Sequence, residues 1–139
     1  MSKNVVLMPG PLLPADPGPW LDGELDPVET LALLDDMAAD FPDLQIIHAH
    51  PGWPFHHEAV AACWHKSNFW IDLSGFAPRY FPDEVVHYAN SLIQDRVLFG
   101  TDWPVIGIDR WMDEFDELPI KDAVRPKILK ENARRLLGI

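Results

Sequence analysis

Short apolar runs recur along the chain, each separated from the next by a longer polar and helix-forming stretch. Within each run the apolar residues are nearly continuous and do not alternate with polar ones. That pattern favours parallel strands covered on both faces over half-exposed hairpin strands. The predicted strands are Asn4–Met8, Leu44–Ala49, Phe69–Leu73 and Val97–Gly100.

The stretches between these strands have apolar residues at helical spacing, which predicts a helix in each. The first helix follows Pro27 and presents one apolar face at helical spacing, formed by Val28, Leu31, Leu34, Ala38 and Phe41. Pro54 and Pro82 are expected to open the next two helices, because proline is tolerated in the first turn. The inward residues expected after Pro82 are Val85, Val86, Ala89, Leu92 and Ile93.

The last third of the chain predicts two further helices. Asp109 is expected to cap a short helix that ends near Glu117. A final helix is expected over Ala123–Leu137, with Gly138 terminating it.

Alternating strands and helices indicate βα units with right-handed crossovers. Four such units form either a small open sheet or half of an eight-stranded barrel, as one domain over residues 1–139. The long segment Pro9–Gly23 follows the first strand directly, and long loops in this position often carry functional sites.

The amino-acid composition and net charge disfavour some classes of binding partner. The chain has 139 residues and a formal net charge of −11 at pH 7, which disfavours nucleic acids and anionic membrane surfaces. No apolar stretch is long enough to cross a bilayer, and Met1–Asn4 lead directly into a strand-like run, so we expect no signal peptide. The single cysteine, Cys63, lies on an apolar helix face, where a buried and inert thiol fits a reducing cytoplasm.

Titratable residues stand where the predicted strands end. His48 and His50 end the second strand, Asp72 lies near the end of the third, and Asp102 follows the fourth. In a parallel sheet these ends open onto one side, where ligands bind. His48 and His50 would face the same way on an extended backbone, which allows either a metal-ligand pair or one packed and one exposed histidine. Asp102 is equally compatible with metal ligation and with capping the next turn.

Three residues near these positions are candidates for substrate binding. Arg79 could clamp a carboxylate, although a surface salt bridge is its default role. Trp53 and Trp103 could line an aromatic pocket or simply anchor their loops.

The ordered set of motifs resembles the C-terminal half of the amidohydrolase-related family, which includes aminocarboxymuconate-semialdehyde decarboxylase. The segments that carry the resemblance are FPDLQII followed by HPGWP (residues 41–47 and 50–54), FWIDLSG (69–75), DRVLFGTDWP (95–104) and KENARRLLG (130–138). They resemble the sixth strand and its loop, the seventh strand, the eighth strand and the terminal helix of that family.

This resemblance implies a (β/α)₈ (TIM) barrel that holds one divalent metal, usually zinc. Asp102 matches the metal-binding aspartate after the last strand, and His50 matches the sixth-strand histidine that polarises the substrate or acts as acid/base. His48 has no such match, and the fifth-strand metal histidine of the family aligns with Met8. The family's H-x-H pair lies in the first four βα units, which this sequence does not contain.

Two functions remain open at this point. The first is a metal-dependent hydrolase or non-oxidative decarboxylase of a small carboxylated or cyclic organic substrate, in which the 139-residue chain has no substantial activity alone. The second is a catalytically dead half-barrel, holding no metal, that binds or self-assembles through exposed edge strands. A homo-oligomer is expected from Asn4–Met8 and Val97–Gly100 as edges, and a site improvised from His48, His50 and Asp102 across a dimer is a third possibility.

Overall fold

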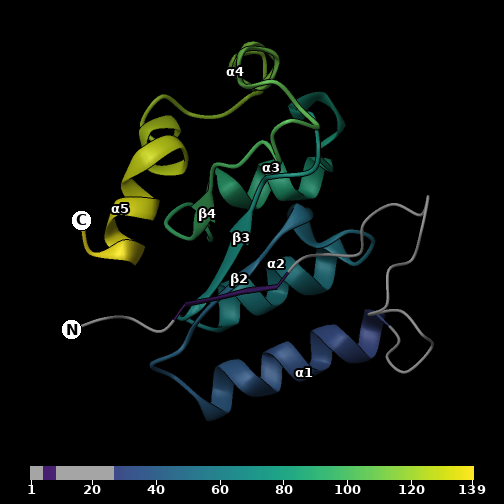
Figure 1. Ribbon diagram of the computed structural model, residues 1–139, viewed down its shortest axis with the longest axis vertical. Helices are drawn as coiled ribbons and strands as arrows, with labels where there is room; N and C mark the ends of the chain where they lie inside the picture. The colour runs from purple at the N-terminus through teal and green to yellow at the C-terminus, as the bar shows by residue number, and fades with distance from the viewer. Residues whose placement is uncertain (1–4, 9–26) are drawn as a thin grey trace.

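The computed structural model describes residues 5–8 and 27–139, and the predicted loop Pro9–Gly23 lies outside them. Four strands form one sheet in the order β1-β2-β3-β4, and every neighbouring pair is parallel. Their bounds are Val5–Met8 for β1, Gln45–His48 for β2, Phe69–Asp72 for β3 and Val97–Leu98 for β4. The predicted parallel α/β arrangement is therefore confirmed (Figure 1).

Helices separate the strands along the chain. They are α1 (Pro27–Asp40), α2 (His56–His65), α3 (Asp83–Ala89), α4 (Ile108–Asp116) and α5 (Asn132–Leu137). Short 3₁₀ turns at His50–Gly52 and Pro78–Tyr80 lie in the loops after β2 and β3, and a π-helical turn at Lys127–Glu131 leads into α5.

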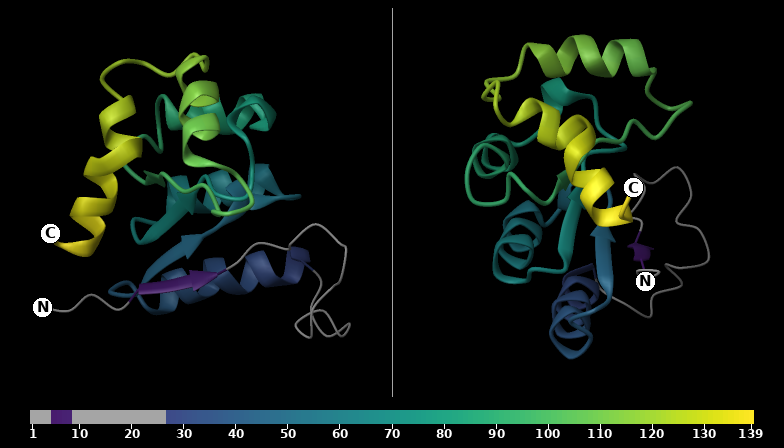
Figure 2. Two further views of the ribbon diagram at one scale, coloured as in Figure 1. Left: turned by 45° about the horizontal axis from the view of Figure 1, so that its top comes forward. Right: turned by 90° about the vertical axis from the view of Figure 1, so that its left-hand side faces the viewer.

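The helices α1, α2 and α3 line up on one side of the strands, as the right-hand view of Figure 2 shows. The side chains of Ile46, Phe69 and Ile71 belong to the main apolar core, which packs between this face of the sheet and the helices. Strand alternation sends Ile47 and Trp70 to the opposite face, where they form a smaller cluster with Leu98 and with Leu136 of α5. We call these two sides the helix-covered face and the inner face.

The predicted helices were correct in place but too long at several ends. Phe41 is 58% exposed because α1 ends at Asp40, and Leu92 is 51% exposed because α3 ends at Ala89. Both predictions extended the helical period past the last turn. Val28 lies in α1, but its side chain is outside what the structure describes.

The helix ends also differ from the predicted capping. Asp109 does not cap α4: Gly107 is the N-cap residue, and Asp109 lies in the first turn. Pro54 precedes α2, which begins at His56. Gly138 ends α5 in the left-handed conformation with φ 74°, as predicted.

The edge of the sheet at β4 is closed by the chain's own C-terminal segment. The carbonyls of Arg96 and Leu98 accept hydrogen bonds from β3, so the Val97 carbonyl and the Phe99 amide point away from the sheet. The Asn132 side chain donates to the Val97 carbonyl at 2.8 Å, and the Phe99 amide donates to the Ile128 carbonyl at 3.1 Å. The expectation of a free Val97–Gly100 edge is therefore wrong, because these polar groups already have partners within the chain.

Two expectations about the whole chain can be compared with the described residues. Cys63 is fully buried, its thiol donates to the Phe69 carbonyl, and burial raises its pKa to about 11, which confirms an inert thiol. Among residues 5–8 and 27–139, no helix has the length and apolar character needed to cross a membrane.

Candidate active site at the carboxyl end of the sheet

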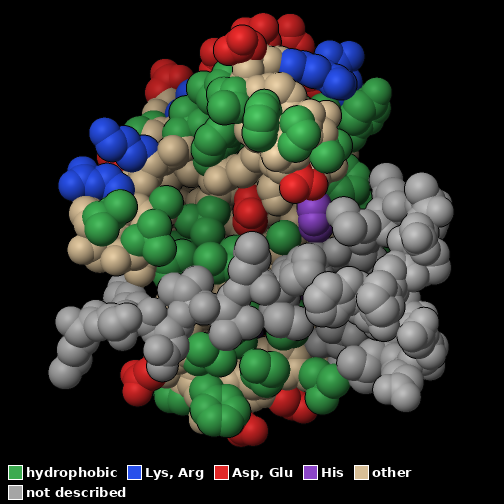
Figure 3. Space-filling view, in the orientation of Figure 1, with side chains coloured by type: hydrophobic (Ala, Val, Ile, Leu, Met, Phe, Trp, Pro, Cys, Tyr) green, Lys and Arg blue, Asp and Glu red, His purple; other side chains and the backbone are tan. Residues whose placement is uncertain are grey.

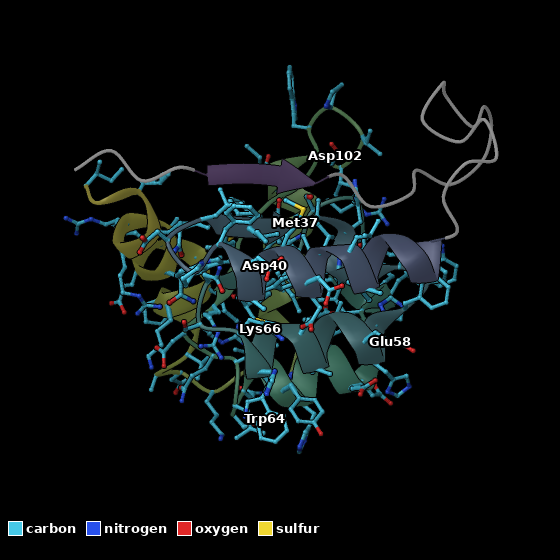
Figure 4. The ribbon with its side chains drawn as sticks, turned by 90° about the horizontal axis from the view of Figure 1, so that it is seen from below. Met37, Asp40, Glu58, Trp64, Lys66 and Asp102 are labelled. Carbon is cyan, nitrogen blue, oxygen red and sulfur yellow. The ribbon has the colours of Figure 1, made fainter. Side chains whose placement is uncertain are left out.

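The parallel strands deliver His50, Asp72 and Asp102 to the same end of the sheet. Asp72 is the last residue of β3, while His50 and Asp102 lie in the loops that follow β2 and β4. In the view of Figure 4, the labelled Asp102 lies beyond β1 from α1 and α2, on the side of the inner face. Figure 3 shows acidic and histidine side chains close together in the middle of a largely apolar face.

His50 and Asp102 share an unusual backbone conformation. Their φ angles are 58° and 59°, which place both residues in the left-handed region. This left-handed region is disfavoured for residues with a Cβ atom, and such strain tends to be retained at functional sites. At both positions it turns the chain sharply just after a strand and leaves the side chain at the rim of the sheet.

Two glycines make room for the polar side chains at this rim. A Cβ atom on Gly75 would lie 1.7 Å from Nδ1 of His50, and one on Gly100 would lie 2.3 Å from Oδ1 of Asp72. Any residue other than glycine at position 75 or 100 would therefore force the side chain of His50 or Asp72 to move. The imidazole and the carboxylate are thus packed directly against backbone.

Asp72 is a member of the site that the sequence placed at a strand end but to which it gave no catalytic, binding or metal role. Its Oδ1 accepts a hydrogen bond from the Ser74 amide at 3.0 Å, and its Oδ2 accepts one from the Ser74 hydroxyl at 3.1 Å. Burial raises the pKa of Asp72; the negative charge of Asp102 also raises it, whereas His50 lowers it. His50 and Asp102 each lie within electrostatic reach of Asp72. The available signal was the Asp-x-Ser spacing at the end of a predicted strand.

The structure separates His48 from this group. In register, His48 pairs with Ile71, and its ring stacks on Phe69, so it lies on the helix-covered face. Its Nδ1 atom has no hydrogen-bond partner, and burial lowers its pKa to about 4. The expectation that His48 and His50 face the same way is wrong, because His50 lies past the strand in a left-handed turn. The geometry gives no support to a pairing of His48 and Asp102 as metal ligands.

The predicted substrate-binding residues lie in the loops around the rim. The Arg79 guanidinium donates to Glu114 of α4 at 2.5 Å, and Arg110 donates to the same carboxylate at 2.8 Å. These two arginines lower the pKa of Glu114 to about 2. Trp53 packs at a tilt against His56 and Phe76.

Trp103 follows Asp102 directly and is 72% exposed. It is therefore free to contact a ligand, whereas Arg79 is already engaged by a carboxylate of the chain. A substrate role for Trp53, Arg79 and Trp103 stays a prediction.

The donor set does not complete a metal site within the described part of the chain. No three His, Cys, Asp or Glu side chains of residues 31–139, whose side chains the structure describes, are grouped so that they could hold an ion. A catalytic zinc usually has three protein ligands and one open position. Asp102 supplies one oxygen donor at the rim, and any further ligands would come from outside the described residues.

Comparisons with known proteins bear on the family and the fold. The protein-family model described as Amidohydrolase matches residues 23–139. A gamma-resorcylate decarboxylase from Rhizobium radiobacter is 39% identical over 75 residues, which cover 53% of this chain and 22% of that protein.

Two solved structures place the fold. An uncharacterised TIM-barrel protein from Bordetella bronchiseptica matches with a TM-score of 0.78 and 30% identity, over 96% of this chain and 45% of that one. A dihydroxybenzoic acid decarboxylase from Polaromonas, with bound manganese and the inhibitor 2-nitroresorcinol, matches with a TM-score of 0.59 and 28% identity, over 81% of this chain and 39% of that one. The chain spans less than half the length of each of these three proteins. The predicted fold class, part of a (β/α)₈ barrel, is confirmed.

Proposed function

Because this chain belongs to the amidohydrolase family, we propose that it forms the C-terminal half of a metal-dependent decarboxylase acting on a small hydroxylated aromatic acid. The observation that carries the proposal is that His50, Asp72 and Asp102 lie at the same end of the sheet, with His50 and Asp102 close enough to Asp72 to affect its pKa. The names of the gamma-resorcylate and dihydroxybenzoic acid decarboxylases among its relatives support this substrate class.

His50 is the group best suited to move a proton. Loss of carbon dioxide breaks the bond between the ring and the carboxyl carbon, and the electron pair stays on the ring carbon. That carbon must then accept a proton, which an imidazolium can supply. Packing against Gly75 fixes the position of the His50 ring. Trp103, exposed beside Asp102, is positioned to cover an aromatic ring.

Among the described residues, Asp102 is the one that we propose as a ligand of the metal. A bound divalent cation would supply Lewis-acid polarisation of the substrate oxygens. Carboxylate donors suit manganese and magnesium, and zinc also accepts them, so Mn²⁺ is the first probe and Zn²⁺ the second.

Metal binding tests the role of Asp102. We expect the purified chain to bind Mn²⁺ weakly, as measured from the loss of the free-ion signal in electron paramagnetic resonance. The variant Asp102→Asn should lose this binding, whereas Asp43→Asn should not, because the exposed Asp43 precedes β2 at the other end of the sheet. Equal Mn²⁺ binding by Asp102→Asn and the wild type would contradict the assignment.

A second candidate function follows from the incomplete donor set. The chain would then be a metal-free half-barrel that binds or self-assembles through the edge at β1, since the β4 edge is closed. The Mn²⁺ measurement distinguishes the two, because a metal-free module binds no Mn²⁺ through Asp102. Neither candidate predicts substantial carbon dioxide release from 2,6-dihydroxybenzoate by the 139-residue chain alone, and turnover at ordinary enzyme rates would exclude the inactive module.

The same proposal covers partners and location. We propose a homo-oligomer, and sedimentation that shows a well-folded monomer at high micromolar concentration would argue against it. The net charge of −11 supports the absence of nucleic-acid and membrane partners. The single buried thiol of Cys63 supports a cytoplasmic location.

A further inference from the structure

Asp72 lies on the inner face of the sheet, where its carboxylate can meet a ligand. It pairs in register with Leu98 and stands two residues after Trp70, and both of those side chains belong to the inner cluster. Asp72 itself is only half-buried, so its side chain is not sealed within the core. It is the one polar residue of β3, whose other members are Phe69, Trp70 and Ile71.

The carboxylate is held in one orientation from two sides. Ser74 donates its amide to Oδ1 and its hydroxyl to Oδ2, and the Cα atom of Gly100 closes the space behind Oδ1. A carboxylate offers about four lone-pair positions, of which Ser74 occupies two. Asp72 is therefore a fixed acceptor with unused capacity, and only a hydrogen-bond donor can fill it.

The neighbouring charges restrict which donor fits. The charged groups near Asp72 are Asp102, which raises its pKa, and His50, which lowers it. A ligand carboxylate would be repelled by Asp72, so the carboxyl group of an aromatic acid must point elsewhere on the rim. A neutral ring hydroxyl can donate to Asp72 while the ring lies over the apolar inner face.

We propose that Asp72 is a substrate-binding residue that accepts a hydrogen bond from a ring hydroxyl of the aromatic acid. This inference rests on the proposed decarboxylase function and adds the residue that selects hydroxylated rings. It predicts that affinity depends on the ring hydroxyl and on Asp72 together.

Ligand binding tests this coupling without any need for turnover. The probes are resorcinol, which has two donor hydroxyls, and 1,3-dimethoxybenzene, which has the same ring substitution and no donor. Their affinities for the full 139-residue chain are measured by ligand-observed nuclear magnetic resonance. We expect Asp72→Asn to weaken resorcinol binding about tenfold, because a hydrogen bond to a charged acceptor is lost, and to leave 1,3-dimethoxybenzene unaffected.

Two further variants separate binding from a structural role. Ser74→Ala removes the hydroxyl that donates to Oδ2 but keeps the backbone amide that donates to Oδ1 and keeps the charge of Asp72, so most of the preference for resorcinol should remain. Asp43→Asn makes the same charge change at the opposite end of the sheet and should match the wild type. Circular dichroism confirms that each variant is folded before its affinity is compared.

The outcomes distinguish this inference from the proposed function. If Asp72→Asn binds resorcinol as tightly as the wild type, or if Ser74→Ala loses as much affinity as Asp72→Asn, the binding role of Asp72 is overturned while the decarboxylase proposal stands. If the wild type binds no resorcinol and Asp102→Asn leaves Mn²⁺ binding unchanged, both are overturned.

Discussion

On the helix-covered face of the sheet, side chains such as Ile46, Phe69 and Ile71 belong to one continuous apolar core that reaches from α1 to the C-terminal segment. On the inner face the apolar cluster is small, with Trp70 and Leu98 covered by Leu136. The polar groups that could perform chemistry stand at the carboxyl end of this inner face. The sheet thus separates the residues that hold the fold from those that meet a ligand.

This difference has an energetic basis. Burial of apolar surface dominates folding, and the helix-covered face supplies most of it. Groups on the inner face contribute less to folding, so charged and strained residues such as His50 and Asp102 can be tolerated there. The comparison makes four measurable predictions.

The largest expected effect comes from truncating equivalent apolar residues on the two faces. Ile71→Ala should destabilise the protein by about 4 kcal/mol, because Ile71 is fully buried in the main core. Leu98→Ala removes a similar volume from the small inner cluster and should cost about 2 kcal/mol. Denaturant unfolding measures both values. An equal or larger cost for Leu98→Ala would contradict the division of roles between the faces.

Two features could be predicted from the sequence because they depend on short runs of neighbouring residues. These are the positions of the buried strands and the end of the sheet at which the polar residues lie. Apolar runs such as Phe69–Leu73 report burial on both faces, and parallel strands must end on the same side. The placement of His50 and Asp102 at the carboxyl end of the sheet follows from these two facts.

Features that depend on contacts distant in sequence could not be predicted. Asp72 has room only because Gly100, two residues after the end of β4, packs beside it. The β4 edge is closed by Asn132, which lies 35 residues after Val97. The sequence predicted that His48 and His50 face the same way, and the left-handed turn at His50 breaks the strand alternation on which that prediction rested.

The next effect concerns His48, the titratable residue buried on the helix-covered face. Its pKa of about 4 lies below the usual 6.5, so an unfolded chain takes up a proton that the folded chain refuses. Stability is therefore full above pH 6.5 and falls as the pH drops toward 4, by about 3 kcal/mol. His48→Leu should lose this part of the pH dependence.

The measurement is the unfolding free energy of the wild type and His48→Leu at several pH values from 7 to 4. Only the difference between the two profiles reports His48, because carboxyl groups titrate equally in both proteins. Parallel profiles would show that His48 is protonated freely in the folded chain, as expected for an accessible histidine.

A smaller effect is expected at the closed edge of the sheet. Asn132→Ala leaves the Val97 carbonyl without its donor in a buried position and should cost about 2 kcal/mol. Amide exchange at Phe99 should accelerate, because its bond to the Ile128 carbonyl depends on the same segment. Asn90→Ala is the control, since Asn90 donates to the Pro119 carbonyl at an exposed position and should cost less than about 1 kcal/mol. Unchanged exchange at Phe99 in Asn132→Ala would show that Asn132 does not close this edge.

The smallest effect tests the fit of the rim itself. Gly100→Ala places a Cβ atom against Oδ1 of Asp72, so the carboxylate must move and its bond to the Ser74 amide must weaken. We expect a cost of about 1 kcal/mol, at the low end for overpacking, because the half-buried side chain of Asp72 can move and the Cβ atom of Ser74, 2.9 Å from the added atom, needs only a small adjustment. Amide exchange at Ser74 should accelerate at the same time.

Gly107→Ala is the matched control, because nothing lies within 4 Å of the added Cβ atom and φ at Gly107 is −66°. Its stability should stay within about 0.5 kcal/mol of the wild type, with no change at Ser74. If the Ser74 amide exchanges equally slowly in Gly100→Ala and in the wild type, the Asp72 carboxylate is not held tightly against Gly100. The polar rim of the inner face would then tolerate an added methyl group, and close packing would be confined to the helix-covered face.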